Sequence, residues 1–194
     1  TLLRAKMATI APSTVSLTQT TVYEPESDQL LMYLTGPAGC GKSHSVYAAQ
    51  NFAKDFSHHM ALMFDDSTFW FTACTGSAAA LWGGVTIHSA AHLNKDKITR
   101  DLKEQWKEVR VLIIDEISYF SDSDLSKLEK NLRLLRDRPD IPYGGLSIVF
   151  AGDFHQSKTM SGSPIYESWL IQWHGSLNCT MMLEGSHRFA DDPE

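Results

Sequence analysis

Residues 36–43 are the part of the sequence whose residue types and spacing most clearly support chemistry. They match the pattern G-x-x-x-x-G-K-S/T at every fixed position, as Gly36, Pro37, Ala38, Gly39, Cys40, Gly41, Lys42 and Ser43. Glycines in such a loop let successive backbone N–H groups turn toward a polyphosphate. We expect Lys42 to reach the β- and γ-phosphates and Ser43 to offer its hydroxyl to Mg²⁺. The segment therefore predicts a site for a nucleotide polyphosphate with Mg²⁺.

The segments on both sides of this loop fit a phosphate-binding loop. The apolar run at 30–34 predicts a buried strand that leads into it. Residues 42–56 predict a helix, because apolar side chains recur there at helical spacing, at Val46, Ala49, Ala53 and Phe56. The start of that helix directs the positive end of its dipole at the loop. These flanks disfavour the alternative, a glycine-rich turn followed by a chance Lys-Ser pair.

Two later apolar runs also end in polar residues. The run at 109–114 is followed by Asp115 and Glu116, and the run at 146–151 is followed by a segment that ends in Gln156. Asp115 is predicted to hold Mg²⁺ through its water shell, and Glu116 to orient and deprotonate a water molecule in line with the γ-phosphate. Gln156 could hydrogen-bond the γ-phosphate or that water. A solvated strand end is the alternative for the acidic pair, and the preceding apolar run disfavours it.

Strand and helix signals alternate along the chain. Further strands are expected at 69–73 and 181–183, and short helices around 78–80 and from 86. A longer helix is expected from about Ser123, capped by Asp122 or Ser123, and a charged, solvated segment at 95–107. This alternation predicts an α/β fold, a mostly parallel sheet with helices on both faces. Ligands of such sheets bind outside the carboxyl ends of the strands.

Composition and charge restrict the classes of protein. The chain has 194 residues, enough for one domain, with a net charge of −6, and no apolar stretch in it is long enough to span a membrane. Its three scattered cysteines predict free thiols in a reducing, intracellular setting. The negative charge argues against holding nucleic acid by bulk electrostatics, but it allows local contacts to a nucleic-acid backbone. Residues 1–28 are expected to be a polar lead-in, where Gln19 is the candidate for an adenine contact.

Several motifs occur together in an order that resembles a known family. They lie at 36–43, 72–79, 83–89, 113–116, 144–156 and 187–189. This set is similar to the first RecA-like domain of PIF-type helicases, which belong to the RecD-related, 5′-to-3′ branch of helicase superfamily one. The resemblance spans about residues 29–190. It implies a RecA-like P-loop NTPase domain at 29–194 that uses ATP and Mg²⁺.

The resemblance also implies roles for individual residues. Lys42, Glu116, Gln156 and Arg188 would act on the γ-phosphate or the attacking water, and Ser43 and Asp115 would serve Mg²⁺. Four residues fall in segments that contact the backbone of single-stranded DNA in this family, namely Thr75, Gly76, Thr86 and His88. The second RecA-like domain is missing from the chain, so we expect the isolated chain to bind nucleotide without unwinding DNA.

Departures from the family pattern leave other interpretations open. Residues 157–160 read Ser-Lys-Thr-Met where family members commonly have Leu-Pro-Pro, and Cys40 replaces a small or hydroxyl residue. An AAA-type regulatory ATPase and a non-catalytic nucleotide-binding module are the alternatives, and nucleotide-dependent oligomerisation would favour the first. Trp82 and Trp106 are candidates for stacking on bases, although packing within the fold is favoured. The sequence leaves the oligomeric state open.

Overall fold

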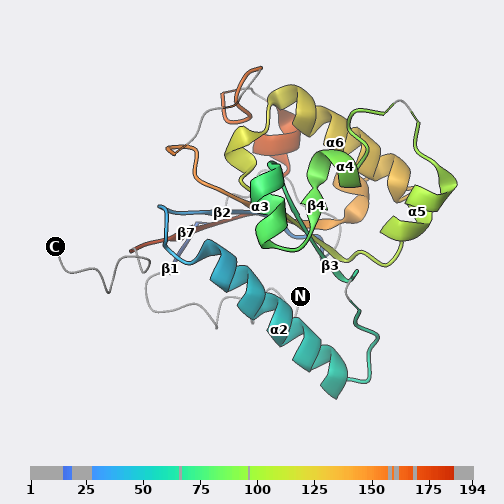
Figure 1. Cartoon of the computed structure of the whole chain (residues 1–194), viewed down its shortest axis with the longest axis horizontal. Helices are drawn as coiled ribbons and strands as arrows, with labels where there is room; N and C mark the ends of the chain where they lie inside the picture. Colours follow the sequence, from blue (N-terminus) through green and yellow to red (C-terminus); the bar gives the residue numbers. More distant parts are fainter. Residues whose placement is uncertain are drawn as a thin grey trace.

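One seven-stranded sheet forms the centre of the molecule (Figure 1). The computed structural model describes residues 15–18, 28–65, 67–95, 97–156, 159, 162–167 and 170–185. The strand order is β1-β7-β2-β6-β5-β3-β4. All neighbouring strands are parallel except β1 and β7, which are antiparallel. The strands are β1 Val15–Thr18, β2 Leu31–Thr35, β3 Phe69–Ala73, β4 Val85–Thr86, β5 Val111–Asp115, β6 Ser147–Ala151 and β7 Cys179–Leu183.

Helices cover both faces of this sheet, which confirms the predicted fold class. The helix α2, Lys42–His59, lies on one face, and α4 to α6 cover the other (Figure 1). The remaining α-helices are α3 Gly76–Leu81, α4 Ile87–Ala90, α5 Arg100–Trp106 and α6 Asp122–Leu135. Three single turns, at Ile117–Tyr119 (η1), Pro142–Gly145 (η2) and Ile171–Gly175 (η3), complete the described elements. No helix in the described ranges combines the length and the apolar character needed to cross a bilayer.

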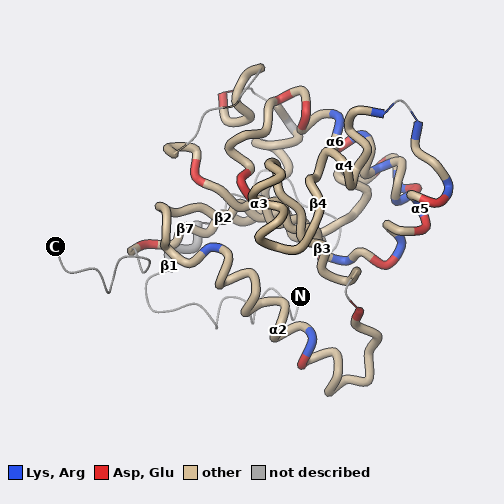
Figure 2. The backbone as a smooth tube through the Cα atoms, viewed as in Figure 1, with Lys and Arg blue, Asp and Glu red and all other residues tan. Residues whose placement is uncertain are grey.

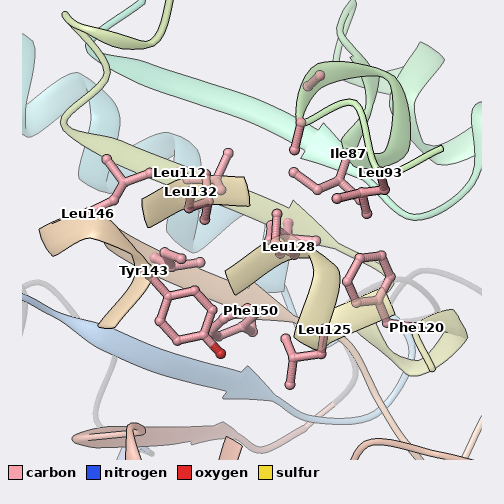
Figure 3. Close-up of a cluster of buried hydrophobic side chains, with 14 of the residues drawn as sticks. Ile87, Leu93, Leu112, Phe120, Leu125, Leu128, Leu132, Tyr143, Leu146 and Phe150 are labelled. Carbon is pink, nitrogen blue, oxygen red and sulfur yellow. The ribbon is translucent and has the colours of Figure 1, made fainter. Parts of the chain in front are cut away.

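The central strands separate two hydrophobic cores by the alternation of their side chains. In β5, Leu112 and Ile114 belong to the core beneath α6, whereas Val111 and Ile113 belong to the core beneath α2. Such a strand is buried on both faces, which explains its continuous apolar run. Figure 3 shows the larger core, where Leu125, Leu128 and Leu132 of α6 face Leu112, Tyr143 and Phe150. The leucine stripe of α6 is therefore core packing.

Some local predictions need correction. The charged segment at 95–107 was expected to face water, but Leu102 and Trp106 of α5 are buried in the larger core. The indole of Trp106 donates to the carbonyl of Ala90 at 3.2 Å, which agrees with the favoured expectation that Trp106 packs within the fold. The N-cap of α6 is Ser121, whose hydroxyl accepts from the backbone N–H of Asp124, rather than Asp122 or Ser123.

Two strands were not predicted. β1 lies within the polar segment that was interpreted as a lead-in, and it pairs with β7. β4 has two residues and pairs with β3 where a helix start was expected. Neither strand has the apolar run by which the central strands were recognised. The predicted strands at 30–34, 69–73, 109–114, 146–151 and 181–183 are confirmed within two residues at their ends.

Candidate nucleotide-binding site

The predicted site segments lie along one edge of the sheet, in the order of the strands they follow. β2, β6, β5 and β3 are consecutive parallel neighbours, so their carboxyl ends share an edge. The loop at 36–43 follows β2, the segment ending in Gln156 follows β6, and Asp115 and Glu116 end β5. Thr75 and Gly76 follow β3 at the next position along the edge. The fold therefore brings together three polar clusters that lie far apart in the sequence.

The loop at 36–43 has the backbone of a phosphate-binding loop. Gly36, Gly39 and Gly41 have φ values of 142°, 75° and 93°, which favour glycine. A Cβ on Gly36 would lie 2.4 Å from the carbonyl oxygen of Leu183, so the loop packs closely on the end of β7. The ammonium of Lys42 donates to the carbonyls of Gly36 at 2.6 Å and of Pro37 at 3.1 Å, which holds its charge at the mouth of the loop.

Asp115 is oriented by two hydrogen bonds. Its Oδ1 accepts from the backbone N–H of Glu116 at 2.9 Å, and its Oδ2 accepts from the indole Nε1 of Trp82, also at 2.9 Å. The backbone N–H of Cys74 bonds the carbonyl of Asp115 at 2.9 Å and ties the ends of β3 and β5 together. The Asp115 side chain therefore has a fixed direction before any ligand binds.

Glu116 has an unusual backbone and a perturbed carboxyl group. Its φ of 58° and ψ of 42° lie in the left-handed region, which non-glycine residues adopt rarely and often at functional sites. Burial raises the pKa of the Glu116 carboxyl above its ordinary value, and the charge of Asp115 adds to this. The charges of Lys42 and Asp153 also act on this pKa, the first lowering it and the second raising it. A general base is most efficient when its pKa lies near the working pH, so a raised pKa makes this carboxyl group a better general base.

Gln156 is held by Asp153, a residue to which sequence reasoning gave no role. The Gln156 amide Nε2 donates to Asp153 Oδ2 at 2.6 Å, and the backbone N–H of His155 donates to Oδ1 at 2.9 Å. Burial opposes ionisation of Asp153, but the hydrogen bonds from His155 and Gln156 and the charge of Lys42 prevail and lower its pKa. Asp153 is buried, whereas the side chain of Gln156 is exposed. A carboxylate three residues before the glutamine was the signal available in the sequence.

The donor atoms suit Mg²⁺ in the presence of a nucleotide. The described residues contain no group of three or more His, Cys, Asp or Glu side chains that could hold a metal ion by themselves. Ser43 and Asp115 offer hard oxygen donors, and Mg²⁺ typically takes one or two protein ligands, phosphate oxygens and water. The residues present therefore fit Mg²⁺ bound with a nucleotide. None of the three cysteines, all of which lie in the described ranges, forms a disulfide, as predicted, and Cys40 is buried within the loop.

The four predicted DNA contacts lie around the starts of two short helices. The hydroxyl of Thr75 caps α3 by accepting from Ala78 N, and that of Thr86 caps α4 by accepting from Ser89 N, each at 3.3 Å. His88 Nε2 lies 3.8 Å from Asp124 Oδ2. No Lys or Arg occurs from 73 to 94. Figure 2 shows that many of the lysine and arginine residues instead lie around α5 and the neighbouring part of α6.

Two predicted site residues, Gln19 and Arg188, lie outside the described residues. Their roles toward adenine and the γ-phosphate stay predictions. The assigned roles of the loop, of Asp115, Glu116 and Gln156, and of the DNA contacts also stay predictions, although the fold places these residues along one edge of the sheet.

Comparisons with known proteins agree with this arrangement. The family model described as PIF1-like helicase matches residues 16–164. The ATP-dependent DNA helicase PIF6 of Trypanosoma brucei brucei is 31% identical over 150 residues, which is 71% of this chain and 18% of that protein. The crystal structure of Pif1 helicase from Candida albicans is 30% identical with a TM-score of 0.65, over 81% of this chain and 36% of that one.

A second solved structure supports the fold alone. Pif1 helicase from Bacteroides, crystallised with ADP-AlF3 and single-stranded DNA, is 23% identical with a TM-score of 0.59, over 82% of this chain and 33% of that one. These matches identify the domain as the RecA-like P-loop fold. The chain spans about a fifth to a third of the relatives it matches. Because the family model covers most of its length, the chain belongs to the PIF1-like helicase family.

Proposed function

We propose that this chain is the ATP-binding motor domain of an ATP-dependent DNA helicase, which translocates on single-stranded DNA and hydrolyses ATP to ADP and phosphate. One observation carries the proposal. The P-loop, the acidic pair and Gln156 follow three adjacent parallel strands, and the charge of Lys42 acts on both Glu116 and Asp153. This constellation suits hydrolysis better than nucleotide binding alone, because binding does not require a carboxylate such as Glu116.

The P-loop would hold the polyphosphate through its backbone N–H groups, with the start of α2 behind them. Lys42 would exchange its bonds to the carbonyls of Gly36 and Pro37 for the β- and γ-phosphates. Ser43 and Asp115 would hold Mg²⁺, which when bound neutralises charge on the phosphate oxygens. Gln19 remains the candidate for the adenine contact.

Hydrolysis would depend on Glu116 and on the group around Gln156. Glu116 orients the attacking water and accepts its proton, a task that its raised pKa favours. Gln156 is oriented by Asp153, leaving its amide oxygen for the water or the γ-phosphate. Arg188 would add positive charge to the transition state, as an arginine finger does.

Single-stranded DNA would bind next to this site along the same edge. Four predicted contacts lie at the ends of β3 and β4, one and two strands beyond the acidic pair, namely Thr75, Gly76, Thr86 and His88. Contacts from hydroxyl and backbone N–H groups do not depend on base sequence, and they suit a segment without Lys or Arg. The solved Bacteroides helicase with the same fold was crystallised with single-stranded DNA and ADP-AlF3.

Translocation would need a second RecA-like domain. Cleft closure between two such domains moves one along the strand relative to the other, and a single domain has no partner against which to move. We therefore expect the 194-residue chain to bind nucleotide with Mg²⁺, to hydrolyse it weakly and not to unwind DNA.

The experiment compares ATP-dependent strand separation by this chain with that by a longer form that carries a second RecA-like domain. Unwinding by the longer form alone is the expected result. Unwinding by the 194-residue chain would refute the need for the second domain. Nucleotide binding without turnover in both forms would instead identify a non-catalytic module, and nucleotide-dependent oligomerisation would favour an AAA-type ATPase.

A further inference from the structure

Trp82 joins the segment between two predicted DNA contacts to the carboxylate proposed for Mg²⁺. It is the C-cap residue of α3, which begins at Gly76, and it precedes the glycine pair that leads to β4. Its indole Nε1–H donates to Asp115 Oδ2 at 2.9 Å, across 33 positions of sequence. Hydrogen bonds to an ionised acceptor are about twice as strong as neutral ones. Trp82 is not among the residues assigned to nucleotide, Mg²⁺ or DNA backbone above.

Aromatic packing fixes the direction of the indole N–H. The Trp82 ring stacks on Phe71 of β3 with centroids 4.8 Å apart and an interplanar angle of 23°. It also contacts Tyr47 of α2 with centroids 4.7 Å apart. Tyr47 and Phe71 stack on each other at 5.6 Å. A ring held in a three-ring cluster has little freedom to turn, so its N–H reaches Asp115 only while the end of α3 keeps this position.

The backbone after Trp82 is equally constrained. A Cβ on Gly84 would lie 2.6 Å from the carbonyl oxygen of Phe71, so the chain runs directly against β3. The N–H of Gly84 also bonds the carbonyl of Ala79 within α3, at 3.0 Å. A displacement of α3 is therefore transmitted to both the indole and the start of β4.

The two bonds that orient Asp115 differ in what they depend on. The bond to Oδ1 comes from the backbone of the next residue, Glu116, and is local to the end of β5. The bond to Oδ2 comes from Trp82 and depends on where the segment at 75–86 lies. A contact that moves this segment would change the second bond and leave the first intact.

We propose that Trp82 is a positioning residue that couples single-stranded DNA at 75–86 to the orientation of Asp115, and thereby to Mg²⁺-dependent nucleotide binding. This inference rests on the proposed function. Coupling between two binding sites is reciprocal, so with nucleotide bound, DNA must change the apparent Mg²⁺ affinity by the same factor as Mg²⁺ changes the DNA affinity. Trp82 acts through Asp115 and does not itself touch the reacting atoms.

The first test compares Trp82→Phe with Trp70→Phe in the 194-residue chain. Trp70 lies on the same strand as Phe71 but contacts the ring of Trp106 of α5 in a tilted arrangement, and it serves as the matched control. Binding of a fluorescent ATP analogue is measured while Mg²⁺ is titrated, so the readout does not need turnover. We expect Trp82→Phe to weaken the apparent Mg²⁺ affinity on the order of 10-fold, the usual effect of one hydrogen bond to a charged group. Trp70→Phe should leave it unchanged.

A second variant excludes loss of packing as the cause. Replacement of Trp82 by 3-benzothienylalanine keeps the bicyclic ring and removes the N–H donor. It should weaken the Mg²⁺ affinity as Trp82→Phe does, while the melting temperature stays near that of the wild type. Wild-type Mg²⁺ affinity in this variant would overturn the proposal.

The DNA arm uses a longer form that carries a second RecA-like domain. An oligothymidylate should shift the apparent Mg²⁺ affinity of the wild type and of Trp70→Phe, but not that of Trp82→Phe. An equal shift in all three overturns the coupling role and leaves the proposed function intact. Failure of the wild type to bind the nucleotide with Mg²⁺ would overturn both proposals.

Discussion

Replacing Asp153 by asparagine tests whether the group that holds Gln156 contributes to catalysis. Asp153 accepts from Gln156 Nε2 at 2.6 Å through one oxygen and from His155 N at 2.9 Å through the other. Asparagine keeps one acceptor and replaces the other by an NH₂ group, which faces the donor of Gln156. The Gln156 amide must then turn over, so that its oxygen and nitrogen exchange places.

The hydrogen bond from Gln156 to the carboxylate of Asp153 sets the size of the expected loss of turnover. One hydrogen bond to a charged group contributes about 1.5–3 kcal/mol. If the transition state loses this whole contribution, kcat for ATP hydrolysis falls about 10- to 150-fold. The assay is steady-state ATP hydrolysis with saturating single-stranded DNA, in a longer form that carries a second RecA-like domain. His155→Ala is the matched control, because its exposed ring can be removed while the Asp153–Gln156 bond remains.

A double-mutant cycle shows whether Asp153 acts through Gln156. In a Gln156→Ala background, Asp153→Asn should cause little further loss of kcat, because the group that it orients is already absent. If the factors by which the two single mutations lower kcat multiply in the double mutant, Asp153 does not act through Gln156 and the reasoning is refuted. So would an unchanged kcat in Asp153→Asn accompanied only by a lower melting temperature.

Three further predictions concern the P-loop, the carboxyl group of Glu116 and the thiol of Cys74. In urea denaturation, Gly36→Ala should lower the free energy of unfolding by about 1–3 kcal/mol, because its φ is strained for alanine and its Cβ would clash with Leu183. The control is Gly76→Ala, whose Cβ meets nothing within 4 Å. It should change the free energy of unfolding by less than about 1 kcal/mol. The pKa of Glu116 is raised in the folded state, so its ionisation destabilises the fold as pH rises above the ordinary glutamate pKa. Glu116→Gln should therefore melt at a higher temperature than the wild type at pH 7, and thermal melts should show that this difference disappears near pH 4. A difference that persists at pH 4 would contradict the raised pKa. Burial and the charge of Asp115 raise the pKa of the Cys74 thiol well above its usual value. Iodoacetamide at pH 8 should therefore modify this half-buried thiol far more slowly in the folded chain than after unfolding, which peptide mass spectrometry would detect.

The sequence predicted the centre of the sheet well because each central strand is a continuous apolar run that ends in polar residues. β2 and β5 are buried on both faces, and their ends place the P-loop and the acidic pair. β4 was missed because two residues carry no periodicity. The buried side of α5 was missed because charged residues surround Leu102 in the sequence, although packing of Trp106 within the fold was the favoured interpretation. Tertiary packing decides both cases.

The supporting contacts of the site were harder to predict than its principal residues. The bond from Trp82 to Asp115 joins positions 33 residues apart, and it exists because β3 and β5 are neighbours and α3 returns to their ends. The role of Asp153 depends on a tight turn after β6 that brings Gln156 back to it. A motif names the residues that act, whereas the contacts that orient them depend on the strand order.

The measurement that tests the central claim most directly is ATP hydrolysis with and without single-stranded DNA. It is made on this chain and on a longer form that carries a second RecA-like domain, each beside its Glu116→Gln variant. The account predicts weak turnover by the chain alone, and DNA-stimulated turnover by the longer form that Glu116→Gln abolishes. Turnover that neither responds to DNA nor depends on Glu116 would contradict the assignment of this domain as a helicase motor.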